Sequence, residues 1–177
     1  MLKIIHLEPG IAVAPQLAEP DFAKIAACGF RTVVDSRPDG EAPDQLAHAR
    51  AEAVACRHGL AFRYQPVMSV NVMDEDVVDA FARLMDDLPR PILFYCATGM
   101  RCVILWAQAA ALRLGIDEVL GVAHGSGYNL DFLRDTLKER QVTPAQSRSL
   151  VGAVGATCSL TRNADYASHE ARARNPG

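Results

Sequence analysis

The chain has 177 residues, a formal net charge of −3 and five cysteines, and half of its residues are hydrophobic. This composition excludes a disulfide-rich scaffold, a collagen-like chain, a coiled coil and a disordered chain, and the scattered basic residues argue against nucleic-acid binding. There is no apolar run near the roughly 18 residues of a membrane span, and the first residues lack a secretory-signal pattern. We therefore expect a cytoplasmic protein with no nucleic-acid or membrane partner.

Short runs rich in β-branched and aromatic residues alternate with helical patterns over residues 1–140. The predicted strands are Ile4–Leu7, Ile11–Ala14, Thr32–Asp35, Ala61–Val67 and Ile92–Tyr95. The predicted helices are Asp21–Cys28, Pro43–His58, Asp74–Leu88, Arg101–Leu114 and Leu130–Leu137. This alternation predicts an α/β fold with a mainly parallel sheet of about five strands flanked by helices. Ligand sites in such folds lie at the carboxyl ends of the strands.

The composition changes near residue 140. The 37 residues from Gln141 to Gly177 are rich in Ser, Thr, Ala, Gly and Arg, and Tyr166 is their only aromatic residue. This segment carries a net charge of +2, against −5 for residues 1–140. We expect a single domain over residues 1–140, followed by a weakly ordered C-terminal tail over residues 141–177.

The most informative segment surrounds Cys96. An apolar strand leads into Cys96, and Arg101 opens an apolar helix. Four residues separate the two: Ala97, Thr98, Gly99 and Met100. The amides of such a loop, the positive end of the helix and a guanidinium group all attract anions. Because the same surroundings lower the pKa of a thiol, we predict that Cys96 is a thiolate nucleophile and that the loop and Arg101 bind an anionic substrate.

A lone cysteine in this position has a simpler interpretation. Free cysteines are among the most buried residues, and an arginine at the start of a helix often pairs with a carboxylate. The combination of strand, Cys96, glycine-containing loop, Arg101 and apolar helix nevertheless favours the catalytic interpretation.

Three segments together resemble a known family. They are the loop from Cys96 to Arg101, the upstream stretch Thr32–Glu41 (Thr-Val-Val-Asp-Ser-Arg-Pro-Asp-Gly-Glu) and the downstream Gly127–Leu130 (Gly-Tyr-Asn-Leu). From about Ile4 to Leu137 the chain resembles the phosphatase-like domain of the bacterial β-lactamase-hydrolase-like proteins. The resemblance implies a protein-tyrosine-phosphatase-like fold, in a family often labelled as sulfurtransferases.

The length of the loop distinguishes the first two of three functional hypotheses. Protein tyrosine phosphatases have five residues between cysteine and arginine, whereas the four residues here are similar to the rhodanese loop. We therefore expect sulfane-sulfur transfer through a Cys96 persulfide, from a donor such as thiosulfate or a persulfide. The alternative is phosphoester hydrolysis through a phosphocysteine, and the third hypothesis is a non-catalytic module that binds an anion or a partner. We expect no cofactor and no metal, because the His and Cys residues lack paired ligand spacing.

The resemblance also draws attention to the residues on either side of the loop. Tyr95 stands where phosphatases usually have His, and Cys102 stands where they have the Ser or Thr that hydrogen-bonds the thiolate. Cys102 is either a small residue packed in the first helical turn, the interpretation we favour, or a resolving cysteine that attacks an oxidised Cys96.

Several other polar residues are candidates for the site. A phosphatase needs a general acid, and Asp74 is the candidate, although an N-cap role for Asp74 is the interpretation we favour. Arg37 either adds charge to the pocket or pairs within its own turn. Gln16 and Tyr128 are weaker pocket candidates. Two further cysteines, Cys28 and Cys56, are expected to lie in the core.

Overall fold

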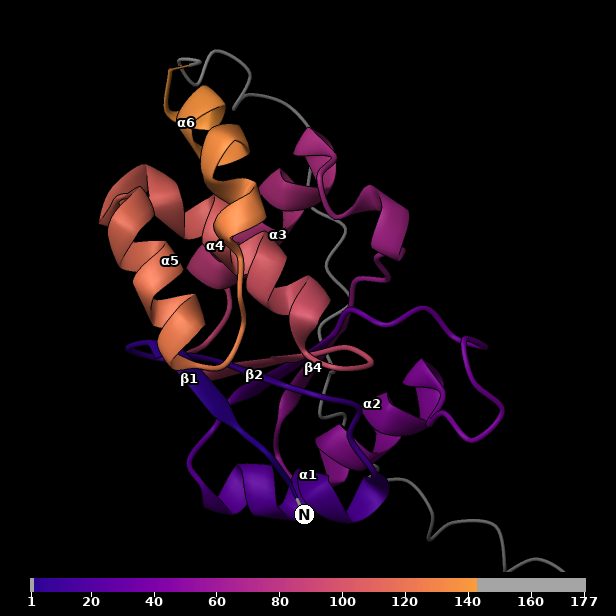
Figure 1. Cartoon of the computed structure of the whole chain (residues 1–177). Coiled ribbons are helices and arrows are strands. Elements are labelled where there is room, and N and C mark those ends of the chain that lie inside the picture. The colour runs from indigo at the N-terminus through magenta and orange to yellow at the C-terminus, as the bar shows by residue number, and fades with distance from the viewer. Residues whose placement is uncertain (1, 143–177) are drawn as a thin grey trace, which may run out of the picture.

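Five short strands form one sheet in the computed structural model, which describes residues 2–142 (Figure 1). The strands are β1 (Ile5–Glu8), β2 (Ile11–Ala14), β3 (Thr32–Asp35), β4 (Ala61–Tyr64) and β5 (Ile92–Tyr95). Their order in the sheet is β1-β2-β5-β3-β4, and only the β1–β2 pair is antiparallel. The predicted mainly parallel five-stranded sheet is confirmed.

Helices cover both faces of the sheet, which therefore has a core on each side (Figure 1). One face carries α1 (Glu19–Ala27) and α2 (His48–Arg57). The other carries α3 (Glu75–Asp87), α4 (Met100–Leu114), α5 (Ile116–Gly125) and α6 (Arg134–Val142). Short 3₁₀ turns, η1 (Ser69–Asn71) and η2 (Asp131–Leu133), precede α3 and α6.

The central strand β5 sends side chains into both cores. Phe94 belongs to the core under α3 and α4, whereas Leu93 and Tyr95 belong to the core under α1 and α2. This explains why the sequence of β5 is continuously apolar rather than alternating, as is typical of strands buried on both faces. The helix that follows, α4, is also buried over most of its length. The strand and helix that flank Cys96 are therefore the rigid centre of the fold.

Most predicted elements are present with small shifts at their ends, and three predictions were wrong. The helix predicted from Pro43 begins only at His48, where the Asp39 carboxylate accepts the His48 backbone N–H at 2.9 Å. The strand predicted to reach Val67 ends at Tyr64, because the neighbouring β3 ends at Asp35. Helix α5 was not predicted, and the positive φ of +88° at Gly115 allows it to follow α4 directly.

Helix α6 continues to Val142, two residues past the predicted domain boundary. The rest of the predicted tail, with Cys158, lies outside the described residues. Within residues 2–142 no helix combines the length and apolar character that a membrane span requires.

Candidate active site around Cys96

The carboxyl ends of three neighbouring parallel strands meet at one place. Ala14 of β2, Tyr95 of β5 and Asp35 of β3 are level with one another across the sheet. The chain segments that leave these strands stay connected, because Gln16 N–H donates to the Ala97 carbonyl at 3.2 Å and Ser36 N–H donates to the Tyr95 carbonyl at 2.9 Å. Residues far apart in sequence are thus collected at the edge where such folds bind ligands.

The loop after Cys96 turns sharply into α4 at Gly99. Gly99 has a φ of +88° and is the N-cap of α4, so its carbonyl accepts the Val103 N–H at 3.0 Å. A Cβ atom at this position would lie 2.5 Å from Tyr128 Oη, whose hydroxyl donates to the Thr98 carbonyl at 3.2 Å. Glycine is therefore required here both by the backbone conformation and by the lack of space.

The surroundings of Cys96 stabilise a negative charge on its sulfur. A hydrogen bond from the Cys102 thiol, together with the backbone N–H groups of Cys102 and Thr98 and the positive charge of Arg101, lowers the pKa of Cys96 to about 5 despite its burial. At neutral pH, Cys96 is therefore a thiolate that accepts hydrogen bonds from these groups. Electropositive surroundings of this kind are typical of reactive cysteines, and the nucleophilic role of Cys96 stays a prediction.

Cys102 acts as the donor to Cys96 because it keeps its proton. Its side chain is fully buried, and this burial, together with the neighbouring Cys96 charge, raises the pKa of Cys102 well above its usual value. The Ser36 hydroxyl interacts with the Cys102 sulfur and partly offsets that rise. Cys102 thus lies against the Cys96 sulfur, at the position where the resemblance places a hydroxyl, and its choice between a packed and a resolving cysteine stays a prediction.

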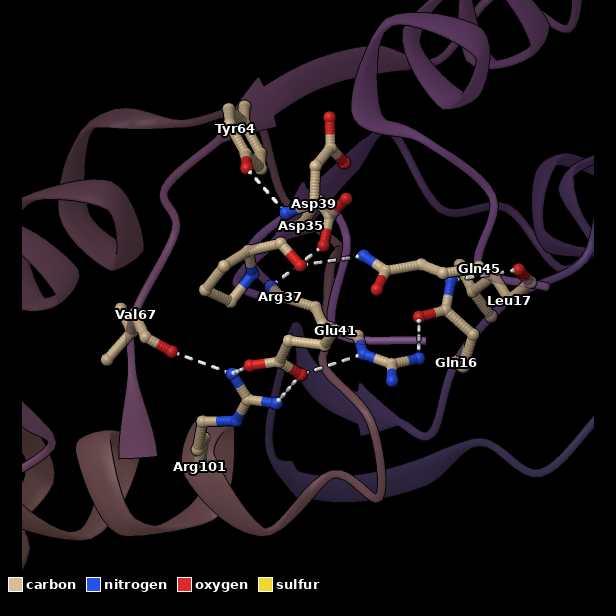
Figure 2. A network of polar contacts seen from close by, with 11 residues as sticks. Gln16, Leu17, Asp35, Arg37, Asp39, Glu41, Gln45, Tyr64, Val67 and Arg101 are labelled. Carbon is tan, nitrogen blue, oxygen red and sulfur yellow. Dashed lines mark hydrogen bonds and ion pairs between the residues drawn. The ribbon is translucent and has the colours of Figure 1, made fainter. Parts of the chain in front are cut away.

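Arg101 is buried, and its guanidinium group points toward the Glu41 carboxylate (Figure 2). Its Nη1 donates to Glu41 Oε1 at 2.9 Å and to the Val67 carbonyl at 2.7 Å, and its Nη2 donates to Glu41 Oε2 at 2.6 Å. Burial acts against the guanidinium charge, but these contacts and the Cys96 thiolate outweigh it and raise the pKa of Arg101. Arg101 therefore supplies a fixed positive charge beside the loop.

Arg37 pairs within its own turn, one of the two roles that the sequence left open, and it also contacts Gln16. Its Nε donates to Glu41 Oε2 at 2.9 Å within its own turn, and its Nη1 donates to Gln16 Oε1 at 2.9 Å. Because Glu41 also binds Arg101, Arg37 belongs to the polar network of the site (Figure 2). Gln16 and Tyr128, the weaker candidates, both contact the loop through Ala97 and Thr98.

Asp74 occupies the N-cap position of α3, as favoured from the sequence, with Glu75 and Asp76 in the first turn. Its side chain does not bond a helix amide, however, and Asp74 Oδ2 accepts a hydrogen bond from Asn71 Nδ2 at 2.7 Å. Within the described part of the chain, Asp74 is not among the groups that shift the pKa of Cys96. Its assignment as a general acid stays a prediction.

Two polar side chains lie buried under the site. Burial raises the pKa of Asp35 to about 6, although Asp35 Oδ1 accepts the Arg37 N–H at 2.9 Å. The neighbouring Tyr95 hydroxyl interacts with the Asp35 carboxylate without ordinary hydrogen-bond geometry, and burial raises the pKa of Tyr95 as well. Tyr95, which stands where phosphatases usually have His, therefore interacts with Asp35 at the end of β3.

Sequence reasoning missed Glu41 as a site residue and placed two cysteines wrongly. Glu41 and Arg101 are 60 residues apart, and no local sequence pattern connects them. The one available signal was that both residues follow predicted strands that become neighbours in the sheet. Cys28, predicted to lie in the core, is exposed because it is the C-cap of α1, and Cys56 is half-buried on α2. Among the described residues, no cluster of three or more His, Cys, Asp or Glu side chains could hold a metal ion.

Comparison with known sequences agrees with the resemblance noted above. Residues 3–113 match the family model "Beta-lactamase hydrolase-like protein, phosphatase-like domain". A beta-lactamase hydrolase-like protein of Xylella fastidiosa is 30% identical over 149 residues, which cover 82% of this chain and 34% of that protein. Its counterpart in Agrobacterium fabrum is 27% identical, over 70% of this chain and 30% of that protein. The chain thus spans about a third of the length of these relatives.

Solved structures show the same fold. The nma1982 protein of Neisseria meningitidis, which carries a provisional phosphatase description, is 31% identical, with a TM-score of 0.70 over 77% of this chain and 97% of that chain. Pseudomonas aeruginosa TpbA, solved in complex with pTyr, is 14% identical, with a TM-score of 0.55 over 79% of this chain and 93% of that chain, and shows the fold alone. The fold is therefore that of the protein-tyrosine-phosphatase-like enzymes, as the resemblance implied. On the strength of the family match and of these neighbours, the chain belongs to the phosphatase-like domain family of the beta-lactamase hydrolase-like proteins.

Proposed function

We propose that this domain hydrolyses phosphomonoesters through a phosphocysteine intermediate at Cys96. The observation that carries the proposal is the Cys96 thiolate held by loop amides and the Cys102 thiol, with the charge of Arg101 beside it. The phosphatase-like family and fold support hydrolysis rather than the sulfur transfer expected first from the loop length.

Two displacements at phosphorus complete the reaction. The Cys96 sulfur attacks the phosphorus and forms the S–P bond while the P–O bond to the leaving alcohol breaks. Water then attacks the same phosphorus, the S–P bond breaks, and inorganic phosphate and the thiolate are released. The loop amides and Arg101 stabilise the charge on the phosphoryl oxygens in both steps. A pKa of about 5 makes Cys96 a thiolate when it attacks and a good leaving group afterwards.

The leaving oxygen needs a proton unless it is stable as an anion. Asp74 is the proposed donor, because its carboxylate makes no hydrogen bond to a helix amide and instead accepts one from Asn71. Aryl phosphates suit such a site best, because phenols are much more acidic than alkyl alcohols and depart with less protonation. We therefore expect a small anionic phosphoester as the substrate, with aryl esters turned over fastest.

The second candidate function is sulfane-sulfur transfer through a Cys96 persulfide. It is favoured by one observation, the four-residue spacing between Cys96 and Arg101. Thiosulfate would donate its outer sulfur to the thiolate, with sulfite as the leaving group, and this step needs no general acid.

The test compares both chemistries in one set of variants. Wild type, Cys96→Ser and Cys28→Ser are assayed for phosphate release from phenyl phosphate and for thiocyanate formation from thiosulfate and cyanide. We expect phosphate release that is lost in Cys96→Ser and kept in Cys28→Ser, whose thiol is exposed at the end of α1. Thiocyanate formation alone, lost in Cys96→Ser, would replace the proposal with sulfur transfer.

The Asp74 assignment is tested with two leaving groups. Asp74→Asn should slow phenyl phosphate by about 10²-fold, the usual contribution of a general acid, and slow the more activated p-nitrophenyl phosphate much less. Asp76→Asn, in the first turn of the same helix, is the matched control. An equal effect on both esters would remove Asp74 from the reaction.

A further inference from the structure

We propose that Arg37 is a second anion-binding residue beside the Cys96 loop, and that the substrate is a phosphomonoester with a second anionic group near its phosphate. This inference rests on the proposed hydrolysis of phosphomonoesters and narrows its substrate class. Its basis is the way in which Gln16 and Glu41 hold the Arg37 guanidinium.

Arg37 is held by two contacts, and within residues 2–142 one of its terminal nitrogens is not used by either. Its side chain is only 12% exposed. Its Nε donates to Glu41 at 2.9 Å and its Nη1 donates to Gln16 at 2.9 Å, on two sides of the planar group. Neither contact uses Nη2, for which Figure 2 draws no partner. An arginine fixed in this way loses little entropy when it binds an anion.

Arg37 lies directly beside the groups that bind the phosphate in the proposed reaction. Glu41 Oε2 accepts hydrogen bonds from both Arg37 and Arg101, so the two guanidinium groups flank a single oxygen atom. Gln16, which holds Arg37, also donates its backbone N–H to the Ala97 carbonyl of the loop. Arg37 is therefore linked to Arg101 through Glu41 and to the loop through Gln16.

Arg37 shares its counterion. Glu41 pairs with both Arg37 and Arg101, and Arg101 also faces the Cys96 thiolate. Buried charges need a partner, because burial removes most of their hydration. The phosphoryl group is bound by Arg101 and the loop amides, so a second anionic group on the substrate, a carboxylate or another phosphate, would complete the pairing of Arg37.

Matched substrates test this inference by kinetics. 3-Carboxyphenyl phosphate and 3-carbamoylphenyl phosphate have nearly the same shape and differ by one negative charge. We expect wild type to prefer the carboxylate by roughly tenfold in kcat/KM, the usual worth of one charge-assisted hydrogen bond. Arg37→Gln should lower this ratio to near one, and Arg37→Lys should keep part of it. Arg50→Gln, which breaks a similar pair with Glu19 on α1 and α2, should leave the ratio unchanged.

A binding measurement tests the role of Arg37 without catalysis. In Cys96→Ser, calorimetry should show that pyrophosphate binds roughly tenfold more tightly than phosphate, and that Arg37→Gln removes the difference. Equal ratios in wild type and Arg37→Gln, in both experiments, would reduce Arg37 to a purely structural residue and overturn the inference. A wild type that hydrolyses neither ester but still binds pyrophosphate through Arg37 would instead overturn the proposed function and leave the second anion site in place.

Discussion

Arg101 and Glu41 form a two-point ion pair across 60 residues of sequence, with Nη1 to Oε1 at 2.9 Å and Nη2 to Oε2 at 2.6 Å. The pair joins the first turn of α4 to the turn that follows β3. Because both terminal nitrogens are engaged, the plane of the Arg101 guanidinium is fixed before any substrate arrives. The position of the positive charge beside Cys96 therefore depends on Glu41.

Replacing Glu41 should impair both stability and activity. Glu41→Gln leaves the buried Arg101 without its counterion, so we expect the free energy of unfolding to fall by about 1–3 kcal/mol and kcat/KM for an aryl phosphate to fall about 10–100-fold. Urea unfolding and steady-state kinetics measure the two effects. Glu19→Gln removes the two-point partner of the exposed Arg50 and should barely change the free energy of unfolding, with unchanged activity. Equal losses in both variants would contradict a special role for Glu41.

The Cys102 thiol should set the pKa of Cys96. Cys102→Ala removes the largest stabilising contact, and we expect the pKa of Cys96 to rise from about 5 to roughly 6–7. Cys102→Ser keeps a donor and should leave the pKa low. Ultraviolet absorbance of the thiolate during a pH titration gives the midpoint, with Cys96→Ser as the blank. The same midpoint in the alanine and serine variants would show that Cys102 is not the donor.

Mild oxidation should join Cys96 to Cys102. Peroxide converts the Cys96 thiolate to a sulfenic acid, the Cys102 sulfur displaces its hydroxyl group, and the Cys102 proton leaves with that hydroxyl as water. Peptide mass spectrometry should then detect a Cys96–Cys102 disulfide that thiols reduce, with recovery of activity. In Cys102→Ala the oxidation should proceed to the irreversible sulfinic acid. Cys96 sulfinate without a disulfide in wild type would rule out a resolving role for Cys102.

Space at Gly99 should be limited by Tyr128. Gly99→Ala places a methyl group 2.5 Å from Tyr128 Oη and imposes a left-handed conformation on alanine, so we expect more than about tenfold loss of activity. Gly59→Ala is the control, because an added Cβ there has nothing within 4 Å and only the φ of +72° is unfavourable. It measures how far the backbone conformation alone lowers the stability. Adding Tyr128→Phe to Gly99→Ala should restore part of the activity. If it restores none, the clash is not the cause.

Asp35 should make stability fall as the pH rises through the mildly acidic range. Its folded pKa of about 6 lies above the ordinary value of 3.8, so the stability it contributes is fully present below about pH 4 and is lost as the pH rises through about 6. Asp35→Asn cannot ionise and should gain about 3 kcal/mol relative to wild type between these limits. Urea unfolding at several pH values measures this gain. A difference between Asp35→Asn and wild type that does not change with pH would contradict the raised pKa of Asp35.

Local signals in the sequence determined the fold class and the centre of the site. The site is centred on one continuous segment: the apolar run of β5, Cys96, the loop glycine and Arg101. The conformational preferences of these residues favour a strand, a tight turn and a helix start, and no contact with a distant part of the chain is needed to predict them. The boundary of α2 was less predictable, because it depends on a hydrogen bond from His48 to Asp39 outside the helix.

Only the tertiary structure decided which groups surround the nucleophile. The parallel order β2-β5-β3 brings Gln16, Arg37 and Glu41 to the loop after Cys96, although no sequence period connects these positions. The same packing buries Asp35 and Tyr95 together and so raises the pKa of Asp35. A sequence lists which charges and donors exist, but their energies depend on distance and desolvation, which are fixed only when the strands pair.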